Sequence, residues 1–97
     1  MSNSPLTITH YSDPGHGWYR VQSWVIQALD LTDQISPYSY LSRKYVYLEE
    51  DADAALFFAT LGERGIQPRI FTKHTNRPSN IRNYPAYSHQ ALLDLIG

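Results

Sequence analysis

The chain has 97 residues, of which 42% are hydrophobic and 18% charged, and its formal net charge is −1. This length and composition fit one ordinary globular domain, residues 1–97, and exclude a disordered chain or a second domain. The absence of cysteine excludes disulfides, thiolate metal sites and a cysteine nucleophile.

The charged residues are unevenly distributed along the sequence. Residues 1–63 contain three basic and eight acidic side chains, whereas residues 64–97 contain five basic side chains and one acidic side chain. Such an asymmetry can indicate a binding surface. The two halves can also neutralise each other when they fold together. The sequence leaves both interpretations open.

The sequence also bears on location. No apolar stretch reaches the roughly 20 residues that cross a bilayer, and residues 1–7 lack the basic start and apolar run of a signal peptide. Small secreted domains often depend on disulfides, so the lack of cysteine favours the cytoplasm. We therefore expect a cytoplasmic protein with no membrane partner.

The first third of the chain predicts a strand, a turn and a helix. Apolar and polar side chains alternate over residues 6–11, which predicts a half-buried strand with Leu6, Ile8 and His10 on one face. A turn rich in glycine and proline follows at residues 13–17. Apolar residues at helical spacing then predict an amphipathic helix that ends before Pro37: Val21, Trp24, Val25, Ala28 and Leu29.

The rest of the chain predicts two strands and two helices. Residues 45–48 are β-branched and aromatic, which predicts a central strand, and Asp51 is the expected N-cap of the next helix. Residues 69–73 predict another strand, and residues 75–87 a long loop. Ser88 is expected to cap a last helix, whose apolar residues are Leu92, Leu95 and Ile96.

These elements together predict an α+β fold. We expect a small, mostly antiparallel or mixed sheet of three to four strands, with two to three helices packed on one face, because that arrangement buries all the apolar stripes. The order of the strands does not follow from the sequence.

Cations and tyrosines gather toward the end of the chain. The candidate binding residues are Arg69, Lys73, His74, Arg77, Arg82, Tyr84 and Tyr87. Guanidinium groups bind phosphate and tyrosine rings stack on bases, which favours a nucleic acid. Tyrosine and arginine are also enriched at protein interfaces, which favours a protein partner. A third alternative is a loop that packs back on the domain, its arginines paired with the acidic half.

Four further tyrosines cluster before and within the expected central strand, namely Tyr38, Tyr40, Tyr45 and Tyr47. Alternating tyrosines on a sheet can form a recognition surface. They can also be core rings whose hydroxyls reach water. The sequence does not decide between these two roles.

Histidine and carboxylates form a second candidate site. His16 lies between two glycines, and Glu49 and Glu50 belong to an acidic cluster with Asp51 and Asp53. A small enzyme that uses His16 with Glu49 or Glu50 as acid and base is one alternative. The spacing matches no metal motif, and the helix dipole explains the acidic cluster. We therefore expect no cofactor, no metal and no complete catalytic set.

Three segments carry a family resemblance. Residues 12–18 (SDPGHGW), 35–40 (ISPYSY) and 46–53 (VYLEEDAD) resemble a group of small uncharacterised proteins encoded by bacteriophages and plasmids of Gram-negative bacteria. The resemblance implies an accessory protein of a mobile genetic element, made in the cytoplasm of a bacterial host. It also implies a non-catalytic role in binding a host protein, such as a defence or regulatory component. A homodimer is compatible with this role.

Overall fold

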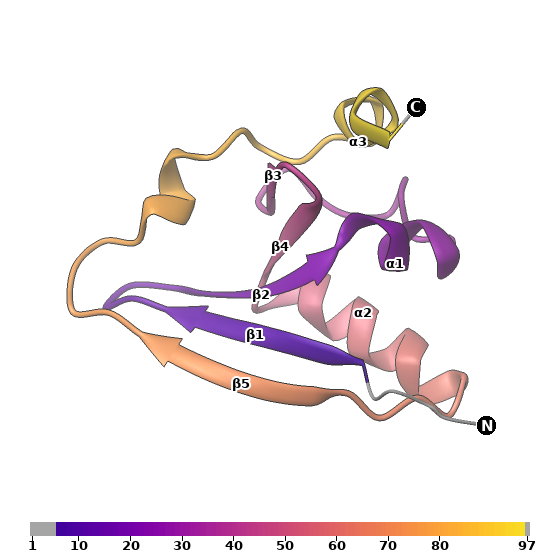
Figure 1. Cartoon of the computed structure of the whole chain (residues 1–97), viewed down its shortest axis with the longest axis horizontal. Helices are drawn as coiled ribbons and strands as arrows, with labels where there is room; N and C mark the ends of the chain where they lie inside the picture. The colour runs from indigo at the N-terminus through magenta and orange to yellow at the C-terminus, as the bar shows by residue number, and fades with distance from the viewer. Residues whose placement is uncertain (1–5, 97) are drawn as a thin grey trace.

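The computed structural model describes residues 6–96 and has an α+β fold built on one mixed sheet of five strands (Figure 1). The strands are β1 (Thr7–Ser12), β2 (Gly17–Gln22), β3 (Tyr40–Ser42), β4 (Tyr45–Glu49) and β5 (Arg69–His74). The helices are α1 (Ser23–Ala28), α2 (Ala52–Glu63), the 3-10 helix η1 (Asn80–Asn83) and α3 (His89–Ile96). The expected α+β class is confirmed, with one strand more than expected. The prediction that residues 1–7 are not a signal peptide falls largely on residues 1–5, which lie outside the described residues.

The strand order is β3-β4-β2-β1-β5. The pairs β1–β2, β2–β4 and β3–β4 are antiparallel, whereas β5 runs parallel to β1. Between β4 and β5 the chain passes through α2, which carries it across β2 and β1 to the far edge of the sheet. Parallel strands need such a crossover connection because a short hairpin cannot join them.

Because side chains alternate along a strand, the sheet has two different faces. On the helix face, Ile8, Val21 and Val46 join apolar residues of all three α-helices in the main core. On the opposite face, Trp18 and Tyr47 pack against Ile81 of η1. The half-buried rings around this second cluster are Tyr11, Tyr40, Tyr45 and Tyr84, so we call this side the tyrosine face.

The alternation predicted for residues 6–11 is confirmed, with Ile8 and His10 on the helix face. The predicted stripe of the first helix is partly wrong. Val21 lies in β2, which continues to Gln22 because it pairs with β4 that far. The helix therefore starts at Ser23, and its orientation buries Val25 and Ile26 while Trp24 is exposed.

The N-terminus of α2 is capped by Glu49 instead of Asp51. The two Glu49 carboxylate oxygens accept hydrogen bonds from the backbone N–H of Asp51 (2.9 Å) and of Asp53 (2.6 Å). The Asp51 side chain makes no capping hydrogen bond. The Asp53 side chain is buried and binds residues 36–39, where the hydroxyl of Ser39 donates to it at 2.5 Å. The acidic cluster is thus largely part of the fold.

Residues 75–87 cross the tyrosine face and end along the outer edge of β3. The Leu41 N–H donates to the Pro85 carbonyl (2.9 Å), and the Tyr87 N–H donates to the Ser39 carbonyl (2.8 Å). The expected cap at Ser88 is confirmed, because its hydroxyl accepts from the Ala91 N–H at 3.0 Å. Leu92 is buried and Leu95 exposed, while the Ile96 side chain lies outside what the structure describes. None of the helices within residues 6–96 is long and apolar enough to cross a membrane.

Candidate functional site

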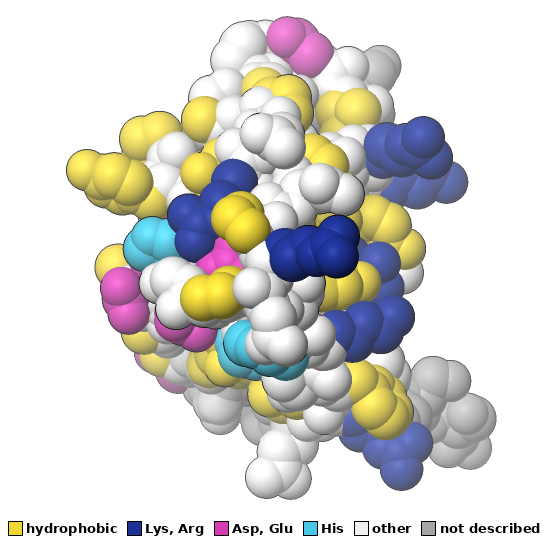
Figure 2. Space-filling view, turned by 90° about the vertical axis from the view of Figure 1, so that its left-hand side faces the viewer, with side chains coloured by type: hydrophobic (Ala, Val, Ile, Leu, Met, Phe, Trp, Pro, Cys, Tyr) yellow, Lys and Arg dark blue, Asp and Glu magenta, His cyan; other side chains and the backbone are white. Residues whose placement is uncertain are grey.

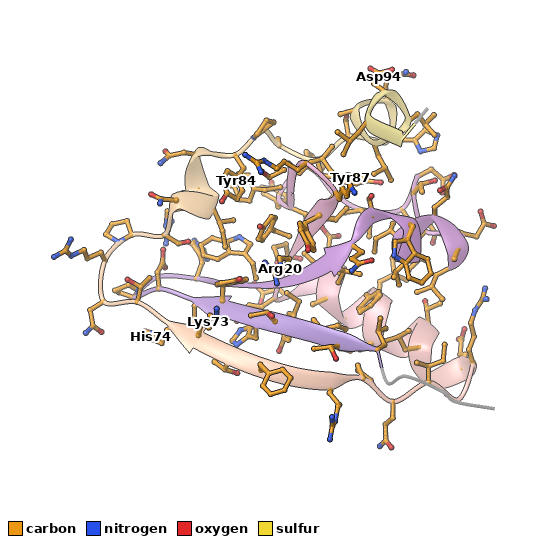
Figure 3. The ribbon with its side chains drawn as sticks, in the orientation of Figure 1. Arg20, Lys73, His74, Tyr84, Tyr87 and Asp94 are labelled. Carbon is orange, nitrogen blue, oxygen red and sulfur yellow. The ribbon has the colours of Figure 1, made fainter. Side chains whose placement is uncertain are left out.

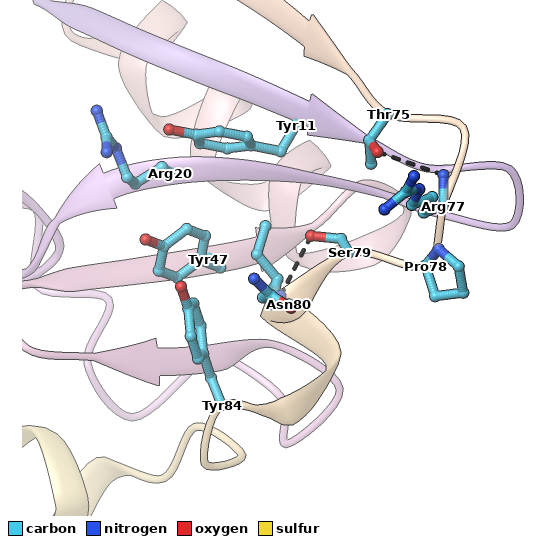
Figure 4. Close-up of a pocket in the computed structure, with 10 residues that line it drawn as sticks. Tyr11, Arg20, Tyr47, Thr75, Arg77, Pro78, Ser79, Asn80 and Tyr84 are labelled. Atoms are coloured by element: carbon cyan, nitrogen blue, oxygen red, sulfur yellow. Dashed lines mark hydrogen bonds between the residues drawn. The ribbon is translucent and has the colours of Figure 1, made fainter.

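A groove of about 570 Å³ lies on the tyrosine face, between the sheet and residues 75–84 (Figure 4). Its walls include Tyr11, Arg20 and Tyr47 from the strands, and Arg77 and Tyr84 from the crossing segment. The volume falls in the range of small-molecule sites, roughly 300–1,000 Å³. The groove therefore combines cations and rings from segments that are far apart in the sequence.

Arg20 is the central cation of this groove, and sequence reasoning did not single it out. Its guanidinium carbon lies 4.5 Å from the centroid of the Tyr45 ring and 5.5 Å from that of the Tyr11 ring. These rings come from β4 and β1, the two neighbours of β2. Such cation–π contacts hold the side chain without a counter-charge. The only signal for this role in the sequence is that Arg20 follows Trp18 by two positions, so that the two side chains share a face when these residues form a strand.

Tyr47 and Tyr84 form the wall next to Arg20. Their ring centroids are 5.2 Å apart, and the Tyr84 hydroxyl points toward Tyr47 (Figure 4). Burial raises the pKa of Tyr47, and the nearby Tyr84 raises it further, although the positive charge of Arg20 acts in the opposite direction. A tyrosine hydroxyl is neutral at physiological pH even at its ordinary pKa of about 10, so Tyr47 offers a hydrogen-bonding group to the groove and not a negative charge.

The strand β5 extends this surface beyond the groove. Its register with β1 places Phe71 beside Thr9 and Lys73 beside Tyr11, so both side chains lie on the tyrosine face, as does Arg69. All three are exposed. We call the combined surface the basic–aromatic face; it consists of Tyr11, Arg20, Tyr47, Arg69, Phe71, Lys73, Arg77 and Tyr84.

The cations of the basic–aromatic face have no carboxylate partner in the part of the chain that the structure describes. Within residues 6–96, only His10 and Arg82 have a carboxylate oxygen within 4.0 Å, and neither belongs to this face. In Figure 2, Lys and Arg side chains lie in the middle and along the right-hand side, whereas acidic side chains lie in the middle, on the left and at the top. The cations of this face come from both halves of the sequence, since Arg20 belongs to residues 1–63, and the ion pair between Arg82 and Asp13 joins the two halves.

That ion pair binds Arg82 to Asp13. The Arg82 Nε donates to Asp13 Oδ2 at 2.6 Å and its Nη2 donates to Oδ1 at 2.7 Å, while the guanidinium lies 5.4 Å from the Trp18 ring centroid. The Asp13 side chain is 0% exposed and also accepts N–H bonds from Gly15 and Ser79. The Arg82 guanidinium holds the pKa of Asp13 well below its usual range. Arg82, a predicted binding residue, thus serves as a structural link.

Two other predicted residues also lie away from the basic–aromatic face. Tyr87 is buried in the main core, where its hydroxyl donates to the Thr32 carbonyl at 2.5 Å and burial raises its pKa to about 12. His74 projects to the helix side of the sheet and bonds Ser12 Oγ at 2.8 Å. Figure 3 shows Arg20, Lys73 and Tyr84, which do contribute to the face, together with His74 and Tyr87. Arg69 and Arg77 complete the predicted residues that the fold brings together.

His16, Glu49 and Glu50 line a second pocket of about 490 Å³. They form no acid–base pair there, because Glu49 caps α2 and Glu50 bonds His10, with 3.3 Å between Oε2 and Nε2. Within residues 6–96 the His16 ring makes no hydrogen bond to a carboxylate. The same part of the chain contains no group of three or more side chains that could hold a metal ion.

Comparison of the chain with family models, with curated proteins and with solved structures gives no match. Fold and site therefore define a class: a small α+β domain whose mixed sheet is covered by helices on one side and presents cations and rings on the other.

Proposed function

We propose that the protein is a non-catalytic binding protein that takes single-stranded nucleic acid on its basic–aromatic face. The observation that supports this most is that cations without a carboxylate partner lie on one face together with the exposed ring of Phe71 and the half-buried rings of Tyr11 and Tyr84. Cations contact the phosphates and rings stack on the bases in proteins that bind single strands.

The positions of the individual side chains support a path for the nucleic acid that runs over β1 and β5 into the groove. Phe71 is 57% exposed and offers a ring on the outer strand, while Tyr11 offers one at the groove. Lys73 lies beside Tyr11 in the register, and Arg77 lines the far wall of the groove. Base faces are accessible only in a single strand, because a duplex stacks them inside.

A host-protein partner, which the family resemblance implies, would meet the same face. Protein interfaces rely on buried apolar and aromatic anchors. Of the large apolar side chains that are exposed within residues 6–96, only Phe71 belongs to this face. Arg82 and Tyr87 are already engaged within the fold. Charge therefore dominates the surface, and we favour a polyanion with stacking bases over an acidic protein.

The test is fluorescence anisotropy with a labelled oligonucleotide of about 12 nucleotides, within the known range of site sizes. We expect the double variant Lys73→Gln/Arg77→Gln to bind about tenfold more weakly, because two phosphate contacts are lost. Arg64→Gln is the matched control, since Arg64 is an exposed cation at the end of α2. Equal weakening by the control, or no binding by the unmodified protein, would refute the proposal.

A second variant separates base stacking from recognition of charge alone. Phe71→Leu keeps the apolar bulk and removes the aromatic ring. Loss of one stacked base costs about 1–3 kcal/mol, so we expect oligonucleotide binding to weaken at least about fivefold. Unchanged affinity in this variant would indicate that the face recognises charge alone.

A further inference from the structure

The strand β5 has an open backbone edge. The Arg69 N–H donates to the Leu6 carbonyl (2.8 Å) and the Thr75 N–H to the Ser12 carbonyl (3.0 Å), so the odd-numbered positions of this strand point their backbone groups at β1. Because these groups alternate in direction along a strand, the N–H and C=O of Ile70, Thr72 and His74 point outward. No backbone partner for these outward groups lies within residues 6–96.

The two edges of the sheet differ. The β3 edge is three residues long and is covered by residues 85–87. The β5 strand forms the other edge of the sheet (Figure 1) and is six residues long. All six residues are exposed, including Ile70 at 46%. Proteins usually protect such an edge with a proline, a bulge or a covering segment, because it is a template for pairing with another strand. Within residues 6–96 the β5 strand has no proline, bulge or covering segment, since Pro68 precedes it, and its protection is limited to the charged side chains of Arg69 and Lys73.

We propose that this edge pairs with the same edge of a second copy of the chain, antiparallel and about a two-fold axis at Thr72. In this register Thr72 lies opposite Thr72 of the second copy, and Ile70 lies opposite His74 of the second copy. These are the three residues whose backbone groups point outward, so each pair can exchange both hydrogen bonds. A two-fold interface of this kind is self-complementary.

The side chains on the tyrosine face also fit this register. It sets Phe71 opposite Lys73, where the ammonium group can contact the ring, and Arg69 opposite Thr75. No two cations lie directly opposite each other, although each Lys73 side chain is a diagonal neighbour of both Lys73 and Arg69 of the second copy. Because the two-fold axis is perpendicular to the sheet, both basic–aromatic faces end on one side of the joined sheet. The pairing itself does not depend on the proposed function.

A single strand edge is a small interface, below the roughly 1,200–2,000 Å² of stable complexes. We therefore expect a weak dimer that dissociates on dilution. Sedimentation velocity without any nucleic acid, over a series of protein concentrations, measures this directly. Salt should strengthen the dimer, because it screens the two Lys73 charges, whereas salt weakens nucleic-acid binding. Failure of the dimer and failure of the proposed function are thus distinguishable.

Thr72→Pro tests the edge, because proline removes the outward N–H at the two-fold axis while the hydrogen bonds to β1 come from other residues. We expect this variant to be monomeric and Thr72→Ala, which keeps the N–H, to dimerise. Thermal unfolding by circular dichroism shows whether both variants remain folded.

Cysteine cross-linking tests the register, and the natural chain contains no cysteine to interfere. In Thr72→Cys the two Cα atoms would be about 5.5 Å apart, within the disulfide range of roughly 4.4–6.8 Å. In Ile70→Cys they would be about 13 Å apart along the strand, too far to bridge. We expect oxidation to cross-link only Thr72→Cys. Two results would overturn the proposal. One is a protein that is monomeric at every concentration, in which case the edge serves another partner. The other is equal cross-linking of both variants.

Discussion

Asp13 and Arg82 are 69 positions apart in the sequence and are joined by two hydrogen bonds of 2.6 and 2.7 Å. This pair connects the turn between β1 and β2 to η1, and so fixes the segment that walls the groove. The turn around His16 thus has a structural role. The buried carboxylate of Asp13 in this turn also accepts hydrogen bonds from the N–H groups of Gly15 and Ser79.

Replacing Arg82 by lysine should destabilise the fold although the charge is kept. Lysine is a point charge and cannot form the two parallel hydrogen bonds of a guanidinium group. We expect a lower melting temperature for Arg82→Lys than for the natural protein, measured by circular dichroism. Arg64→Lys is the control, since Arg64 is exposed and takes part in neither of the ion pairs found among residues 6–96. Equal melting temperatures of the two variants would contradict the structural role.

Asp13 should make stability depend on acid pH. Because its pKa is lowered in the folded state, the carboxylate stabilises the fold at pH values above its unfolded pKa of about 3.9. That contribution is lost as the pH falls from there toward the folded pKa. Urea unfolding at about pH 7 and about pH 3 should therefore show a smaller pH dependence in Asp13→Asn than in the natural protein. The same pH dependence in both would exclude this contribution.

Asp53 should be the acidic residue on which the stability of residues 36–39 depends. Its buried carboxylate accepts from the Ser36 N–H and from the hydroxyls of Ser36 (2.7 Å) and Ser39 (2.5 Å). Hydrogen bonds to a charged group contribute about 1.5–3 kcal/mol, so Asp53→Ala should lower the free energy of unfolding by at least that amount. Asp51→Ala, two positions earlier and exposed, should change it by no more than about 0.5 kcal/mol. Chemical denaturation of both variants checks the difference.

Tyr87 should make stability depend on alkaline pH. Burial raises its pKa to about 12, so the neutral hydroxyl stabilises the fold fully below the unfolded pKa of about 10, and this contribution is lost as the pH rises toward 12. Tyr87→Phe also removes the hydrogen bond to Thr32 and should cost about 1 kcal/mol at neutral pH, with less further loss at alkaline pH. Tyr38→Phe, at an exposed position, should leave both values unchanged. A natural protein as stable at pH 11 as at about pH 8 would contradict this expectation.

Local patterns predicted several elements of the fold because short-range physics determines them, whereas β2, β3 and η1 were not predicted. The alternation over residues 6–11, the aromatic run at Tyr45–Leu48 and the cap at Ser88 each depend only on near neighbours in the sequence. The α+β class follows from these elements, since their apolar faces must be buried together.

Long-range pairing could not be predicted in the same way. Arg82 had eight acids before residue 64 as potential partners, and only the folded chain selects Asp13. Arg20 became central because the strand register placed it between rings of β1 and β4. Tyr87 looked like a binding residue, yet the return of the loop along β3 buries it in the core.

The salt dependence of oligonucleotide binding tests the proposed function most directly. Four cations of the basic–aromatic face are available for phosphates: Arg20, Arg69, Lys73 and Arg77. Each contact contributes about −0.7 to the slope of log affinity against log salt for a single strand, so we expect a slope of about −3. A flat salt dependence, or no binding at low salt, would contradict it.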